Sequence, residues 1–98
     1  MFREIEKTYQ AAVTVTPSSL AALQEMVEAQ KPGSVHYYSL AIAAAQAVGL
    51  PSTRYAVIAI NSGSLYQILA TSYNQTAKIY KNAKPYGAEW MTEWVTIP

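Results

Sequence analysis

The clearest hydrophobic pattern lies between residues 53 and 81, where three β-prone runs alternate with two turn signals. The runs cover residues 53–60, 65–73 and 76–81, and the polar stretches 61–64 and 74–75 separate them. Short polar turns between β-prone runs are typical of hairpins. The sequence therefore predicts a three-stranded antiparallel meander.

The first two runs differ in how their apolar residues are spaced. Residues 54–60 are almost continuously apolar, which predicts a central strand that is covered on both faces. Residues 65–73 alternate, so that Ile68 and Ala70 share one side of the strand and Leu69 lies on the other. Such a sheet needs a helix or a second sheet against its apolar side.

The residues before the meander predict a strand followed by a helix. Apolar and polar residues alternate from 5 to 15, which indicates a long fourth strand. Thr16 is a suitable N-cap and Pro17 suits the first helical position, so a helix is expected over 18–31, before Pro32 and Gly33. Its apolar stripe consists of Leu20, Leu23, Met26 and Val27.

Residues 34–48 predict a second helix. Ser34 is a reasonable N-cap, residues 41–47 are rich in alanine, and residues 49–51 form a stop signal. Residues 35–38 have strand character, which leaves the start of this helix open. The helix is apolar on nearly all sides, so we expect it to be buried between the sheet and another surface.

The last residues carry both helical and extended signals. Trp90 and Trp94 share a face at either spacing, and residues 88–97 predict a short helical turn that passes into an extended end. Taken together, the elements predict a single α+β domain over residues 1–98. Its antiparallel sheet of four or five strands, the long N-terminal strand plus the meander, would pack on two helices.

The composition thins out catalytic and metal chemistry. The chain has no cysteine and no aspartate, and His36 is its one histidine. Thiolate nucleophiles, disulfides and cysteine-ligated zinc are thereby excluded. His36 has no evident orienting carboxylate or nucleophile, so we expect neither a catalytic residue, nor a metal site, nor a cofactor, and interpret the chain as not an enzyme.

The low charge predicts contact with other chains. Charged residues make up 13% of the chain and hydrophobic residues 51%, whereas an ordinary domain is about one quarter charged. A surface so poor in charge favours cover by another chain, and a homo-oligomer is the common solution. The N-terminus lacks a secretory signal and no apolar stretch reaches about 20 residues, so we expect a cytoplasmic protein without a membrane span.

The charges are also segregated along the chain. No acidic residue occurs from 29 to 88, and this span carries a set of cations near the recurring tyrosines at 66, 73 and 80. Aromatic rings can stack on bases while cations hold phosphates. The sequence therefore predicts, as an alternative function, nucleic-acid or nucleotide binding. The anion-binding candidates are Arg54, Lys78, Lys81 and Lys84.

Aromatic residues near the C-terminus are the candidates for contact with a protein partner. Tryptophan is enriched in binding hot spots. The candidates are Trp90, Trp94, Tyr80 and Tyr86. The competing interpretation is that both tryptophans cover the protein's own core.

One local pattern resembles a known motif over about twenty residues. Ala45, Gly49, Leu50, Tyr55 and Ile58 are spaced like the small residue, turn glycine and apolar anchors of the helix-turn-helix of phage repressors. The resemblance implies a second helix in the major groove within residues 41–60, with base contacts from its first residues. Those residues here are Ser52, Thr53 and Arg54. An ordinary helix–turn–strand is the competing interpretation.

The sequence is best interpreted as a non-enzymatic interaction protein. It would bind or block a macromolecular partner, as a homo-oligomer. Small cysteine-free chains of this kind occur among phage accessory proteins and inhibitors.

Overall fold

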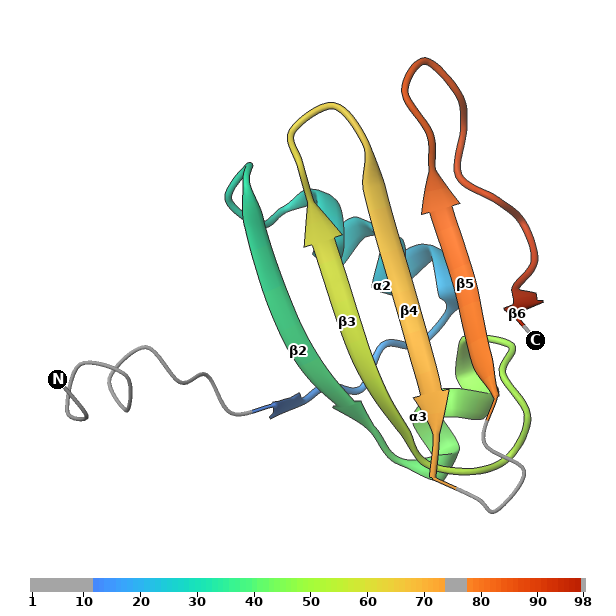
Figure 1. Cartoon of the computed structure of the whole chain (residues 1–98). Coiled ribbons are helices and arrows are strands. Elements are labelled where there is room, and N and C mark those ends of the chain that lie inside the picture. Colours follow the sequence, from blue (N-terminus) through green and yellow to red (C-terminus); the bar gives the residue numbers. More distant parts are fainter. Residues whose placement is uncertain (1–11, 74–77, 98) are drawn as a thin grey trace, which may run out of the picture.

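The computed structural model describes residues 12–73 and 78–97. In this part of the chain, a six-stranded sheet carries two helices on one of its faces (Figure 1). The α+β class is confirmed. The predicted four or five strands are too few, and the sheet is mixed rather than wholly antiparallel, since its first pair of strands is parallel.

The sheet follows the order of the chain. Its strands are β1 (Val13–Thr14), β2 (Ser34–Leu40), β3 (Tyr55–Asn61), β4 (Tyr66–Ser72), β5 (Ile79–Lys84) and β6 (Val95–Ile97), in the spatial order β1-β2-β3-β4-β5-β6. All neighbours from β2 to β6 pair antiparallel. The predicted meander is thus confirmed as β3, β4 and β5, with β3 inside the sheet.

The turns of the meander follow from local chemistry. Between β3 and β4, Gly63 adopts a φ of 93°, which a residue with a Cβ avoids. The Ser62 hydroxyl and backbone N–H both donate to the Leu65 carbonyl and close the turn. The other predicted turn, at residues 74–75, lies outside the described residues.

The first helix, α2 (Leu20–Glu28), is shorter than the predicted 18–31. Its N-cap is Ser19, whose Oγ accepts a hydrogen bond from the Ala22 N–H at 3.1 Å, so the prediction of a cap at Thr16 is wrong. The predicted apolar stripe is confirmed. Leu23 and Val27 are buried, and Leu20 and Met26 pack on the core from partly exposed positions.

The second predicted helix is wrong in its first half. Residues 34–40 form β2, where alternating burial ends in the buried side chains of Tyr38 and Leu40. Only α3 (Ile42–Ala47) is helical, and Gly49 with a φ of 86° follows it. The exposed residues on α3 also contradict burial on all sides. Alanine content favoured a long helix, but aromatic and β-branched residues pairing with β3 prevailed.

The helix-turn-helix interpretation is wrong, because its second helix is absent from the structure. Residues 55–61 form β3, which pairs along its whole length with β2 and β4. The alternation in β3 explains this outcome. Tyr55, Val57 and Ala59 are buried on the helix-covered side, while Ile58 points to the other face.

The N-terminal strand and the C-terminal tail also differ from the predictions. β1 covers two residues and pairs parallel with β2, and residues 5–11 of the predicted strand lie outside the described residues. The tail has no helical turn in its described residues, because the backbone amide of Met91 bonds the Ala83 carbonyl at the side of β5. The extended end is confirmed as β6.

Two buried asparagines join the sheet to the helical layer. The Asn82 side chain on β5 accepts a bond from Gln24 Nε2 at 3.0 Å and donates to the carbonyls of Met91 and Glu93, each at 3.2 Å. The Asn61 amide on β3 donates to the carbonyls of Val27 and Gln30 at the end of α2. These bonds fix α2 and the tail relative to the sheet.

Candidate interaction surface

The face of the sheet away from the helices has no covering element among the described residues (Figure 1). We call it the open face, and define it by the larger apolar side chains, together with one lysine, that point from it on β2 to β6. They are Val35, Tyr37, Ile58, Ile60, Leu69, Ile79, Lys81, Val95 and Ile97.

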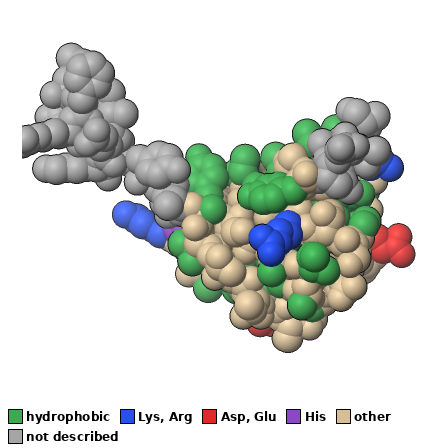
Figure 2. All heavy atoms as spheres, turned by 90° about the horizontal axis from the view of Figure 1, so that it is seen from below, with side chains coloured by type: hydrophobic (Ala, Val, Ile, Leu, Met, Phe, Trp, Pro, Cys, Tyr) green, Lys and Arg blue, Asp and Glu red, His purple; other side chains and the backbone are tan. Residues whose placement is uncertain are grey.

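The open face is apolar and accessible. Its six most exposed apolar residues have exposed fractions from 36% for Ile97 to 51% for Val95. In the view from below Figure 1, hydrophobic side chains gather along the edge that corresponds to this face (Figure 2). One apolar residue on a surface is ordinary, but a contiguous apolar patch across five strands indicates a binding site.

The charge distribution on the open face is simple. Lys81 is its one ionised side chain in the part of the chain that the structure describes. Lys81 lies in the middle row of the sheet, which runs from Tyr37 through Ile58 and Leu69 to Lys81 and then Val95. A single cation is thus surrounded by apolar side chains.

The open face explains one wrong prediction. The continuous apolar run 54–60 was expected to be covered on both faces, yet Ile58 remains 38% exposed at the centre of the sheet. Residues 54–60 are therefore as apolar as those of a strand that is covered on both faces, although no element of the described chain covers the open-face side of β3. This mismatch was already present in the sequence, because Ile58, Leu69 and Val95 occupy outward positions of their strands.

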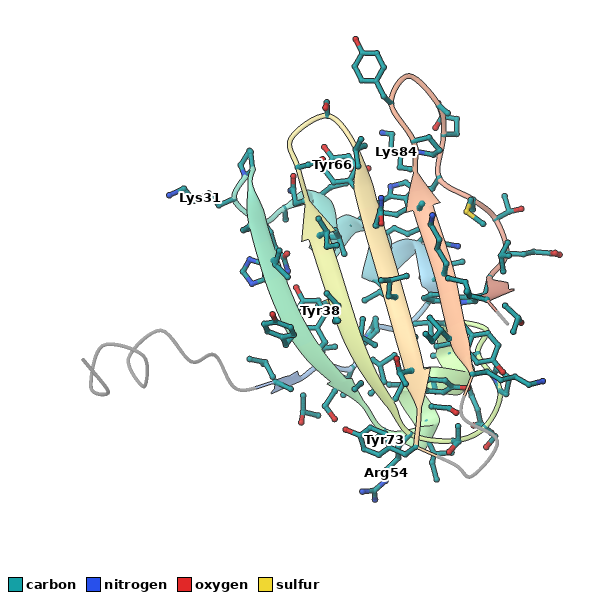
Figure 3. All side chains as sticks on the ribbon, in the orientation of Figure 1. Lys31, Tyr38, Arg54, Tyr66, Tyr73 and Lys84 are labelled. Carbon is teal, nitrogen blue, oxygen red and sulfur yellow. The ribbon has the colours of Figure 1, made fainter. Side chains whose placement is uncertain are left out.

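The predicted anion-binding residues do not share one face. Lys81 and Lys84 on β5 are three residues apart, and a strand alternates sides at each residue, so Lys81 points to the open face and Lys84 to the opposite one. Lys78 precedes the first residue of β5. Arg54 lies at the other end of the sheet from Lys84 (Figure 3). Nucleic-acid or nucleotide binding stays an untested prediction that this dispersal does not favour.

Lys84 is already engaged within the chain. Its Nζ lies 3.4 Å from Oε1 of Glu28 and 5.8 Å from the ring centre of Tyr66. Both side chains of the ion pair are about one third exposed, so the pair contributes at most about 1 kcal/mol.

The two predicted tryptophan contacts pack on the protein's own core. Trp90 stacks on Tyr66 with ring centres 5.7 Å apart, and its Nε1 donates to Oε1 of Glu28 at 2.6 Å. The indole Nε1 of Trp94 donates to the Val48 carbonyl at 2.8 Å. These hydrogen bonds hold the tail against the rest of the protein. Both tryptophan side chains remain partly exposed.

The two tyrosines of the same prediction differ from each other. Tyr80 packs edge-on against Tyr55, with ring centres 5.9 Å apart, on the helix-covered side. Tyr86 is 79% exposed and is available for contact. Neither tyrosine belongs to the open face, so the aromatic prediction and the open face are two different surfaces.

A shallow cavity of about 370 Å³ opens beside Trp94. Its walls include Leu20, Val48, Tyr80 and Trp94, and Glu93 is the one carboxylate that lines it. The hydroxyl side chains in its lining are those of Tyr80, Thr92 and Thr96.

His36, Tyr38 and Tyr55 make contacts with neighbouring residues of the chain itself. His36 is within 3.0 Å of the Ser34 hydroxyl and stacks on Tyr38. Burial raises the pKa of the Tyr38 phenol above its ordinary value of 10.0. Burial, and to a lesser degree the Tyr80 phenol, raises the pKa of Tyr55, whose hydroxyl donates to the Pro51 carbonyl. Across the described ranges, no three metal-binding side chains cluster.

Comparison with protein-family models, curated proteins and solved structures gave no match. Among the described residues, no helix is long and apolar enough to cross a membrane.

Proposed function

We propose that the chain is a non-enzymatic interaction protein that binds a macromolecular partner through its open face. The observation that supports this proposal is the row of apolar side chains left accessible across β2 to β6. Isoleucine, valine and tyrosine side chains on an outward surface contribute hydrophobic free energy only when another surface covers them and removes them from water.

The size of the open face supports a specific interaction. Its six exposed apolar residues present roughly 500 Å² of side chain, which is near the upper end of the largest patches on monomeric proteins. Burying that area releases on the order of 10 kcal/mol per face, which is comparable with the general cost of association. The partner therefore has to contribute a matching apolar area of its own.

A thiol-accessibility experiment tests this proposal. The chain has no cysteine, so Ile58→Cys introduces a single thiol at the centre of the open face. Ala21→Cys, on the exposed side of α2, is the matched control. A membrane-permeant maleimide is applied to the native cells, and the labelling rate of each variant is measured. Each rate is then divided by the labelling rate of the same variant after it has been unfolded, which corrects for the intrinsic reactivity of the thiol.

We expect the thiol at position 58 to react about tenfold or more slowly than the thiol at position 21, since a bound partner protects the surface it covers. Equal normalised rates would mean that the open face is uncovered in the cell, and would rule out the proposed function.

A further inference from the structure

We propose that the partner on the open face is a second copy of this chain, packed sheet on sheet as a two-fold symmetric dimer. This inference rests on the proposed function and names the partner. Its basis is the chemistry of the open face, its area, and the position of Lys81 in the middle row of the sheet.

The chemistry of the open face matches that of its own copy. Within the described residues the face offers one cation and no carboxylate, so it has little to attract an acidic or a basic partner. If the partner also presents an apolar sheet face of the same width, few polar groups of either chain are buried without a hydrogen-bond partner. A two-fold dimer provides such a face, because the same patch is used on both chains.

The area also fits a dimer of this kind. Standard interfaces bury about 800 Å² on each partner, including the polar rim. The exposed apolar side chains supply roughly 500 Å² of this, and the outward Ser39, Gln67 and Thr71 around them supply a rim. Aligned sheets of two copies then pack about 10 Å apart with interleaved side chains.

The position of Lys81 decides between two orientations. Ile58 and Leu69 are the middle residues of β3 and β4, so their row, which contains Lys81, is the middle of the sheet. With a two-fold axis perpendicular to the strands, the Lys81 side chains of the two copies would meet. Two like charges in a desolvated contact are strongly unfavourable.

The other orientation gives Lys81 a partner. With the two-fold axis parallel to the strands and above the boundary between β3 and β4, β5 of one copy lies over β2 of the other. Lys81 then faces Tyr37 of the second copy, and Ile58 faces Leu69. A tyrosine ring and hydroxyl are suitable neighbours for an ammonium group that is losing water.

The mass of the purified protein tests whether the dimer forms. In light scattering coupled to gel filtration, we expect twice the 10.7 kDa mass of one chain. Ile58→Glu places a charge at the centre of each face and is expected to weaken the dimer at least about 100-fold. The control Ala43→Glu, at an exposed position of α3, is expected to leave the stability of the dimer unchanged. Circular dichroism verifies that both variants are folded.

Chemical cross-linking tests the orientation. Face-packed sheets are farther apart than a disulfide reaches, so a short bifunctional maleimide is used. We expect a mixture of Tyr37→Cys and Lys81→Cys chains to give a cross-linked dimer, and either variant alone to give none. Efficient cross-linking of Tyr37→Cys with itself, a variant that keeps Lys81, would overturn the orientation that the charge argument selects.

The outcomes separate this inference from the proposed function. A purified chain that is monomeric up to its solubility limit overturns the second copy as partner. If the thiol of Ile58→Cys is nevertheless protected in cells, the open face binds a different macromolecule and the proposed function stands. If that thiol is also protected in the purified monomer, the chain itself shields the open face, and both proposals fail.

Discussion

Asn82 shows how one polar side chain can hold three segments together. It is fully buried on β5, and its amide is bonded to Gln24 of α2 and to two carbonyls of the tail. A buried amide is tolerated only when its hydrogen-bonding groups are paired. The tail therefore keeps its place through this amide as well as through its tryptophans.

Replacing Asn82 with leucine is expected to lower the free energy of unfolding by about 2–3 kcal/mol, because the Glu93 carbonyl loses its donor from this amide. Urea denaturation measures the change. Gln46→Leu is the control, since the side chain of the exposed Gln46 bonds only the exposed Ser52 hydroxyl among the contacts described. A loss equal to that of the control would show that the amide network contributes nothing.

The buried phenols predict a loss of stability in alkali. The pKa of Tyr38 and of Tyr55 is raised in the folded state, so folding favours the protonated phenols. Their contribution is fully present below the unfolded pKa of 10.0 and is lost as the pH rises through the higher folded values. The free energy of unfolding, measured by urea titration between about pH 8 and 12, is expected to fall above pH 10.

The Tyr55→Phe variant is expected to flatten this alkaline loss. At neutral pH it is about 1 kcal/mol less stable, because the hydrogen bond to the Pro51 carbonyl is gone. Tyr86→Phe, on a highly exposed side chain, is the control and keeps the parent's profile. An unchanged slope in Tyr55→Phe would contradict the assignment.

At the scale of elements, local signals that agreed with tertiary pairing were predictive. The meander was predictable because the turn residues 61–64 and the alternation of apolar and polar residues in 65–73 indicate the same hairpin. Residues 34–48 were mispredicted because alanine and a glycine stop describe α3 correctly, whereas the preceding residues gain more from pairing with β3. No local property of Ser34–Leu40 reveals a neighbouring strand that lies fifteen or more residues away.

The candidate surface was less predictable than the fold. The low charge directs attention to contact between chains, but the predicted set of aromatic contact residues near the C-terminus does not coincide with the open face. Tryptophans are large enough to serve either a core or an interface, and only the packing of Trp90 and Trp94 distinguishes the two roles. The open face required knowledge of which side α2 and α3 cover.

The cap of α2 offers a test within a single element. Ser19→Ala removes the Oγ acceptor of the Ala22 N–H and is expected to lower the free energy of unfolding by about 1 kcal/mol. Thermal or urea denaturation measures it. Ser18→Ala, one residue earlier and exposed, is expected to change it by less than about 0.5 kcal/mol. Reversed effects would place the cap one residue earlier.

At the scale of the whole molecule, the sparse charge predicts how binding responds to salt. An apolar contact is not screened, so self-association through the open face is expected to change by less than about threefold between roughly 0.1 and 1 M sodium chloride. Binding to phosphates would weaken by orders of magnitude over a similar range. Analytical ultracentrifugation measures the dimer, and fluorescence anisotropy with a labelled oligonucleotide provides the comparison.

The agreement between strand order and chain order has a consequence for how this protein folds. From β2 onward, each strand pairs with the one that follows it in sequence, so each connection spans only the residues between two consecutive strands, which limits the entropy lost in closing it. The sheet can grow one strand at a time from its amino-terminal side during synthesis. β1 pairs with β2 only after α2 has been made, and β2 pairs with β3 only after α3 has been made.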